Sequence, residues 1–142
     1  MDGISEILAT YNCVSLDEKI QFELDGVVEK EIKQAYCIEN LEFCVSCMDY
    51  TTLKVSDTEE SVKNFTADLL KKLKKFNLRD VAAVCVFSNY AGIVREGLKG
   101  TEIQTAVVAG NFPNSQTFTE IKLAECKMAI GAGAQEVDVV IS

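Results

Sequence analysis

The sequence predicts an α/β protein built around a parallel sheet, and two observations lead to this fold class. Four short apolar segments fall at 44–50, 81–87, 103–110 and 133–142, and a helical segment separates each consecutive pair. The connections are short, so the strands should be parallel and joined by right-handed crossovers. Two architectures fit: an open doubly wound sheet, or the first half (about four βα units) of an eight-stranded (β/α)8 TIM barrel.

Residues 1–43 precede this pattern and are predicted to form a helical N-terminal extension that covers part of the α/β region at 44–142. A short helix is expected at 4–11. Ser15 and Glu18 have the spacing of a capping box, which predicts a second helix that runs to about Gln34. Its apolar residues recur at helical spacing. They are Ile20, Leu24, Val27, Val28 and Ile32.

Each of the first three predicted strands is followed by residues that typically start a helix. The three helices are expected to end near Phe76, Gly100 and Gly131, and glycine at such a position favours a helix end. The loop at 111–115 holds the only proline of the chain. The helix-start residues are, in order, Asp57 with Glu60, Ser88, and Thr117 with Glu120.

The fourth predicted strand is apolar on both faces except for one carboxylate. Val137, Val139 and Ile141 fall on the face suited to packing against helices, whereas Asp138 and Ser142 fall on the other. Strands buried on both faces are typical of parallel sheets. An ionised carboxylate buried in such a strand costs several kcal/mol unless a cation or hydrogen bonds meet it. Asp138 is therefore a candidate functional residue.

The same alternation places other polar residues on the face of Asp138. Asp49, Thr51, Cys85, Asp138 and Ser142 share one face of the predicted sheet. In a barrel this face would be the interior near the carboxyl ends of the strands, where barrel enzymes hold their active sites. No lysine or arginine falls on it. We therefore expect residues beyond Ser142 to supply the positive partners of the two acids.

Composition excludes several classes of function. The net charge is −8, with a pI of about 4.6, which argues against a nucleic-acid surface because phosphate binding needs clustered cations. No segment approaches the roughly 18 apolar residues of a membrane helix, and no leader opens the chain. We expect a cytoplasmic protein that binds neither membrane nor nucleic acid.

The six cysteines and the absence of histidine limit the chemistry further. Cys44 and Cys47 have metal-ligand spacing, but no second pair matches it and no histidine completes a zinc site. The absence of histidine also excludes Ser-His and Cys-His mechanisms within this chain. We expect no metal and no cofactor.

Taken in order, the motifs of residues 46–142 resemble those of the deoxyribose-phosphate aldolase family. The motifs are Met48-Asp-Tyr-Thr-Thr-Leu53, Asp57-Thr58, Val84-Cys-Val86, Asn111-Phe-Pro113 and Gly133-Ala-Gln-Glu-Val-Asp-Val-Val140. The resemblance implies a (β/α)8 barrel and a class I aldolase. This enzyme reversibly cleaves 2-deoxy-D-ribose 5-phosphate to D-glyceraldehyde 3-phosphate and acetaldehyde through a lysine Schiff base, without a metal.

The resemblance also implies roles for individual residues. Asp138 matches the catalytic aspartate, which transfers protons at the carbinolamine and enamine steps. Asp49 matches an inward aspartate that pairs with a second lysine. Cys85 and Phe112 match residues near the aldehyde, and Thr51 shares the implied substrate pocket with them. The Schiff-base lysine and the phosphate loops belong to the family's second half, which this sequence does not contain.

Structural interpretations of these residues stay open. Asp138 could accept backbone hydrogen bonds, Asp49 could cap the next turn, and Cys85 and Phe112 could serve packing alone. Lys54 matches a lysine of the relatives that is not their nucleophile, and Lys122 and Lys127 are expected to be solvated.

We expect an inactive fragment which, expressed alone, is a marginal monomer, a self-associated dimer or another homo-oligomer, or insoluble, because its open sheet edges favour association. The alternative is a non-catalytic open α/β domain that binds a phosphate ligand or pairs with a full-length aldolase.

Overall fold

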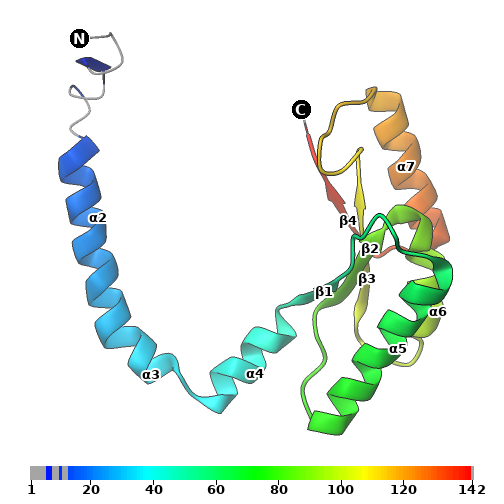
Figure 1. Cartoon of the computed structure of the whole chain (residues 1–142), viewed down its shortest axis with the longest axis horizontal. Coiled ribbons are helices and arrows are strands. Elements are labelled where there is room, and N and C mark those ends of the chain that lie inside the picture. The colour runs from blue at the N-terminus through cyan, green and yellow to red at the C-terminus, as the bar shows by residue number, and fades with distance from the viewer. Residues whose placement is uncertain (1–5, 8–9, 11–12, 142) are drawn as a thin grey trace. The chain divides into compact units, whose positions relative to one another are not determined.

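The computed structural model describes residues 6–7, 10 and 13–141 and divides the chain into two compact units, Met1–Leu41 and Glu42–Ser142. Figure 1 shows the elements of both units along the chain. Each unit is described by itself below.

The first unit is helical. It contains α2 (Cys13–Val27), the π-helical turn η1 (Val28–Ile32) and α3 (Lys33–Ala35). The helix is already formed at Cys13, so the predicted start at Ser15 is wrong. The predicted apolar face is exposed, with Ile20 at 53% and Ile32 at 52%. Most of the helix predicted at 4–11 lies outside the described residues.

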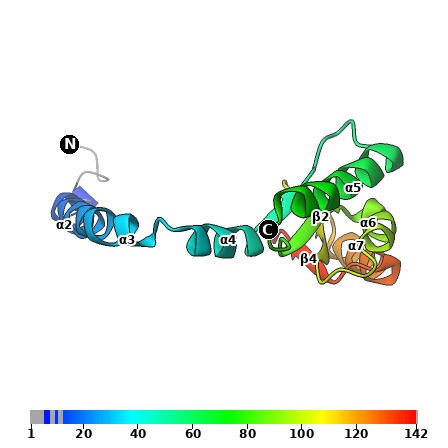
Figure 2. The same ribbon diagram turned by 90° about the horizontal axis from the view of Figure 1, so that it is seen from below.

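The second unit is an α/β domain whose four strands are all parallel, in the spatial order β1-β2-β3-β4. The α/β class and the parallel sheet are therefore confirmed. In Figures 1 and 2 the helices α5, α6 and α7 gather on one side of the sheet. The elements are α4 (Ile38–Ser46, whose residues up to Leu41 belong to the first unit), β1 (Asp49–Thr51), α5 (Glu59–Phe76), β2 (Ala83–Phe87), the 3-10 turn η2 (Ser88–Tyr90), α6 (Ala91–Gly97), β3 (Gln104–Ala109), α7 (Thr119–Ala132) and β4 (Glu136–Val139).

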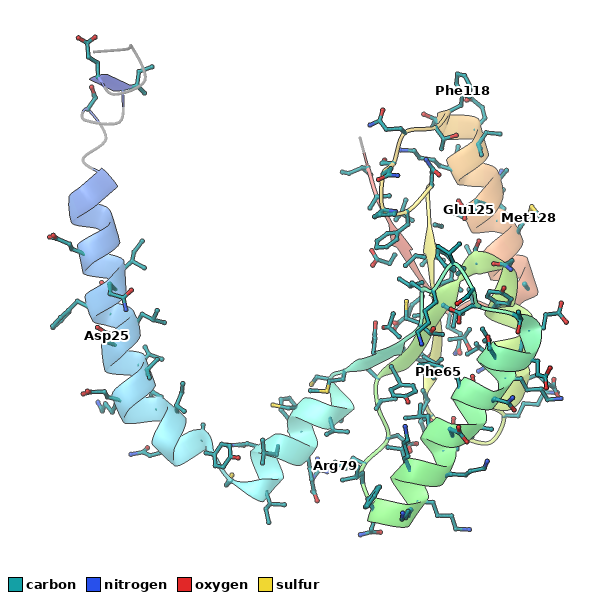
Figure 3. The ribbon with its side chains drawn as sticks, viewed as in Figure 1. Asp25, Phe65, Arg79, Phe118, Glu125 and Met128 are labelled. Carbon is teal, nitrogen blue, oxygen red and sulfur yellow. The ribbon has the colours of Figure 1, made fainter. Side chains whose placement is uncertain are left out.

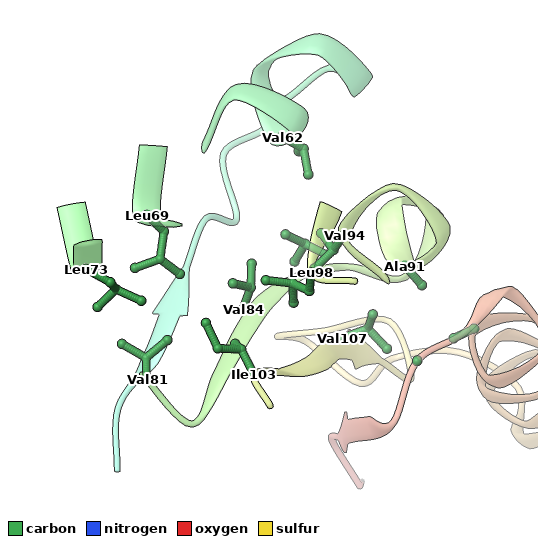
Figure 4. Close-up of a cluster of buried hydrophobic side chains, with 13 residues drawn as sticks. Val62, Leu69, Leu73, Val81, Val84, Ala91, Val94, Leu98, Ile103 and Val107 are labelled. Carbon is green, nitrogen blue, oxygen red and sulfur yellow. The ribbon is translucent and has the colours of Figure 1, made fainter. Parts of the chain in front are cut away.

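The main core fills the space between the sheet and these helices. Val84 and Val86 of β2 and Val107 of β3 are completely buried against Val94 and Leu98, as the close-up in Figure 4 shows for most of them. Burying a side chain of this kind contributes about 1.5–3 kcal/mol. The core therefore fixes which face of each strand turns toward the helices.

A smaller apolar cluster lies on the opposite face of the sheet. It consists of Ala83, Cys85, Ala106 and Val108, all nearly or completely buried. Leu53, Phe87 and Phe112 pack against this cluster and are partly buried. These residues belong to strands and loops, so the helices leave this face uncovered.

The first strand begins later than predicted. Residues 44–50 were expected to be extended, but α4 includes Cys44 and β1 starts at Asp49. The amides of Cys47 and Met48 donate to the carbonyls of Cys44 and Val45, at 3.1 Å each, so helical turns continue to the edge of the strand. Val45 packs against the main core from this helix.

The three predicted helix caps are also wrong, because Asp57 bonds within the preceding loop and Ser88 bonds to a distant helix. Thr58, one residue later than predicted, caps α5 in a capping box with Ser61. Asp57 instead accepts hydrogen bonds from Thr52 Oγ1 (2.8 Å) and the Lys54 amide (2.9 Å). Ser88 makes no cap bond and donates to Glu125. The N-cap position of α7 is Phe118, without a side-chain cap bond.

Gly110 ends β3 with a φ of +79°, a conformation that side chains with a Cβ rarely adopt. A Cβ atom there would lie 3.1 Å from both Val139 Cγ1 and the Val140 carbonyl oxygen. The close approach of β3 and β4 at their carboxyl ends therefore requires glycine.

Replacing Gly110 by alanine is expected to lower the free energy of unfolding by about 1–3 kcal/mol, because the backbone strain adds to the clash with β4. Gly131→Ala is the matched control: Gly131 lies within α7 and has no atom within 4 Å of the added Cβ. That substitution should raise the stability by about 0.5–1 kcal/mol. Urea denaturation followed by circular dichroism measures both, and equal stability of the two variants would contradict the described turn.

Candidate functional site

The candidate site lies on the face of the sheet that the helices leave uncovered. In a parallel pair, residues opposite each other point to the same face. The register pairs Thr51 with Cys85 and Cys85 with Ala106, and it pairs Val108 with Asp138. Because Ala106 and Val108 lie two residues apart, Cys85 and Asp138 share one face of the sheet.

Asp49 lies on this face too, two residues before Thr51 in β1. The structure thus brings together four of the residues singled out from the sequence. Ser142, the fifth member of the predicted face, lies outside the described residues.

The acids of this face are exposed. Asp49, Asp138 and Thr51 are all solvent-accessible, whereas Cys85 is only 6% exposed. The prediction of a fourth strand buried on both faces is wrong for this structure, because β4 is an edge strand and only Val137 packs into the main core. Water therefore solvates Asp138 here, and its charge carries little desolvation cost.

Glu136 is a third acid on this face that the sequence reasoning missed. It pairs with Ala106 and precedes Asp138 by two residues in β4. The signal was available in the sequence, since two carboxylates spaced by two residues in a strand point the same way.

The thiol of Cys85 is a buried nucleophilic group on the same face as the acids. Burial raises the pKa of its thiol above the ordinary value, and the nearby charges of Asp49, Asp138 and Glu136 raise it further. A hydrogen bond with the Thr51 side chain partly offsets this rise in pKa. The carboxylates of this face therefore act together with burial against the thiolate form of Cys85.

Phe112 approaches the same cluster from the loop after β3. It is partly buried and packs against the group that includes Cys85. It also lines a pocket of about 300 Å³ at the carboxyl end of the sheet. The pocket is lined by Phe87, Val108, Asn111, Phe112, Thr117, Ile121 and Glu125. A larger groove of about 580 Å³ runs along α7, but its lining includes no residue of the four strands.

No lysine or arginine occurs in the four strands, so the described sheet offers no cation to the three acids. Lys54 is exposed in the loop after β1, where its amide donates to Asp57. Lys122 was expected to be solvated, but its side chain is half-buried and its ammonium group donates to Ser115 Oγ. Ser115 Oγ in turn donates to the carbonyl of Val140 (3.0 Å), which ties this loop to the residue after β4.

Other chemistry is not assembled in the part of the chain that the structure describes. Cys44 and Cys47 are exposed free thiols, Cys44 within α4 and Cys47 just after it. Among the described residues, no three histidine, cysteine or acidic side chains gather as metal ligands. No described helix has the length and apolar character needed to cross a bilayer.

Comparison of the sequence with known proteins finds deoxyribose-phosphate aldolases. The enzyme of Clostridium novyi (strain NT) is 43% identical over 95 residues, which are 67% of this chain and 39% of the relative. The human enzyme is 33% identical over 156 aligned residues, covering 100% of this chain and 46% of the relative. The chain thus spans less than half the length of these relatives. No protein-family model matches the sequence.

Comparison of the structure with solved structures also finds deoxyribose-phosphate aldolases. A candidate deoxyribose-phosphate aldolase from Coccidioides immitis matches with a TM-score of 0.60 and 27% identity over 71% of this chain and 37% of the other. The tetrameric deoxyribose-phosphate aldolase of Aeropyrum pernix matches with a TM-score of 0.55 and 28% identity, over 69% of this chain and 38% of the other.

The environment of Cys85 gives a test of the site geometry. Alkylation of its thiol by iodoacetamide, mapped by mass spectrometry across pH, should rise at a higher pH in the folded chain than in the denatured chain, because only the thiolate reacts. Asp138→Asn should move the Cys85 profile to lower pH by removing a nearby negative charge. Asp80→Asn, an exposed acid outside the strands, is the control and should leave the profile unchanged. An Asp138→Asn profile identical to the control would contradict the geometry.

Proposed function

Because this chain belongs to the deoxyribose-phosphate aldolase family and spans less than half the length of the members that it matches, we propose that it forms part of a class I aldolase. The proposed reaction is cleavage of 2-deoxy-D-ribose 5-phosphate to D-glyceraldehyde 3-phosphate and acetaldehyde through a lysine Schiff base. The observation that carries the proposal is the gathering of Asp49, Cys85 and Asp138 on the uncovered face of a parallel sheet.

Asp138 is the proposed proton-transfer group. Schiff-base chemistry needs protons removed and returned as the carbinolamine and enamine form, and a carboxylate within reach of the reacting carbon can do both. Its exposure on the open face leaves it free to contact a bound sugar. The apolar surface formed by Cys85, Phe112 and their neighbours suits the small aldehyde, and Thr51 borders it on β1.

The Schiff-base lysine is proposed to come from residues outside this chain. Three carboxylates, Asp49, Glu136 and Asp138, share a face whose strands carry no cation. Ammonium groups placed opposite them would relieve their mutual repulsion, and a neighbouring ammonium group lowers the pKa of the reacting lysine. Asp49 is the proposed partner of that second lysine.

Open edges support a second proposal, that this domain associates with another chain. β1 pairs only with β2 and β4 only with β3 in the described sheet, so each leaves backbone groups unpaired on one side. The partly buried side chains of Leu53, Phe87 and Phe112 add some apolar surface on this face. The partner is a second copy of the chain or a longer aldolase chain, and only the longer chain could bring further strands and a lysine to this face.

A chimera tests the catalytic proposal. In the chimera, this chain replaces the segment of the human enzyme that aligns with it, and that alignment covers the whole of this chain. Asp138→Asn in the chimera should reduce turnover of 2-deoxy-D-ribose 5-phosphate by about 10²–10⁴-fold, the usual contribution of a general acid–base group. Asp80→Asn is the control and should retain activity. An active chimera that tolerates Asp138→Asn would rule out the proposed role.

Borohydride trapping tests where the Schiff base forms. Incubation of this chain alone with the substrate and borohydride is expected to give no covalent adduct, because no lysine lies in the strands of the proposed site. Intact-mass measurement followed by peptide mapping provides the readout. A substrate adduct on one lysine of this chain would place the nucleophile here and overturn the proposal.

Sedimentation velocity tests the association. The isolated chain is expected to sediment as a concentration-dependent mixture in which monomers combine into larger species, because unpaired strand edges and apolar surface favour assembly. A compact monomer at every concentration, from micromolar to the limit of solubility, would speak against the proposed pairing of the open edges.

A further inference from the structure

Glu125 is a half-buried carboxylate near the middle of α7 that accepts hydrogen bonds from two different loops at the carboxyl end of the sheet (Figure 3). Its Oε1 accepts from Ser88 Oγ at 2.9 Å, directly after β2. Its Oε2 accepts from the amides of Gly110 at 2.9 Å and Asn111 at 3.3 Å, directly after β3. One side chain therefore joins the ends of two neighbouring strands.

The second of these loops presents Phe112 to the candidate site. Gly110 and Asn111 both have positive φ angles, +79° and +60°, so the chain turns sharply as it leaves β3. The next residue, Phe112, packs against the cluster that contains Cys85. The two amides that donate to Glu125 thus directly precede the aromatic residue that packs against this cluster.

The chemistry of this anchor favours a carboxylate. Gly110 is buried, and a buried amide without an acceptor is costly. Hydrogen bonds from neutral amides to an ionised carboxylate are about twice as strong as neutral pairs. Glu125 also lines the pocket of about 300 Å³ together with Asn111 and Phe112, so its loss would alter one wall of that pocket.

We propose that Glu125 is a positioning residue, which holds the turn after β3 so that Phe112 stays packed against the cluster that contains Cys85 and lines the pocket. It acts through Phe112 and does not contact reacting atoms. Its relevance to catalysis rests on the proposed aldolase function, but its effect on the loop does not require any turnover by this chain. The role of Glu125 can therefore fail its test while the proposed aldolase function holds, and the reverse.

Three variants separate this role from simple stabilisation. Glu125→Leu keeps a side chain of similar size and removes both acceptors. Glu125→Gln is the conservative rescue: its amide oxygen can accept from Gly110 and Asn111 while its NH₂ group donates to the Ser88 hydroxyl. Glu120→Leu alters an exposed acid in the first turn of the same helix and is the matched control.

Two measurements on the intact chain read out the loop. In Glu125→Leu, hydrogen exchange of the Gly110 amide, followed by NMR, should be about tenfold faster or more, the factor expected for losing one such bond. Alkylation of Cys85 at fixed pH, mapped by mass spectrometry, should rise by a similar factor. Glu125→Gln should restore most of the protection in both measurements, and Glu120→Leu should resemble the parent chain.

Val94→Ala controls for global destabilisation, because it removes buried volume from the core on the helix-covered side of the sheet and leaves Glu125 itself unchanged. If Val94→Ala increases Cys85 alkylation as much as Glu125→Leu at equal loss of stability, the protection is merely structural and the proposal fails. Unchanged Gly110 exchange in Glu125→Leu, or a Glu125→Gln variant that behaves like Glu125→Leu, would also overturn it.

Discussion

The register of the parallel strands is the constraint on which the rest of this structure depends. Val84, Val86 and Val107 are completely buried against the helices, so a shift by one residue would turn them away from the helices and put other side chains, among them Ala83 and Ala106, in their place in the core. The same register places Asp138 and Cys85 together on the other face of the sheet. The apolar core therefore builds the candidate site indirectly, by holding the strands in one alignment.

Alternation along the strands was enough to predict this face, because side chains in a strand point up and down in turn whatever surrounds them. The ends of the helices could not be predicted in the same way. Ser88 resembles a cap in the sequence, but its hydroxyl reaches Glu125, 37 residues away. Asp57 is likewise occupied by Thr52 and the Lys54 amide. The exposure of β4 could not be predicted from its own residues, because a strand is buried only by the elements that pack beside it.

The charges explain why this face is proposed to need other residues for its chemistry. Asp49, Glu136 and Asp138 share a face with Cys85, whose thiol pKa is raised by burial and further by their charges, and the strands supply no cation in return. A class I aldolase needs ammonium groups at this position, so acids without cations are what one part of such a site would look like. Hydrogen bonds fix the loops around this face. Asp57 holds the loop after β1, Glu125 of α7 holds the segments after β2 and β3, and Ser115 holds the residue after β4.

The most direct test of this account is a crystal structure of the chimera with the human relative after borohydride reduction in the presence of substrate. The account predicts a reduced adduct on a lysine outside this chain, with the sugar carbon within hydrogen-bond or van der Waals reach of Asp138 on the face that carries Cys85. An adduct bound on the helix-covered side of the sheet, or separated from Asp138 by intervening protein, would contradict it.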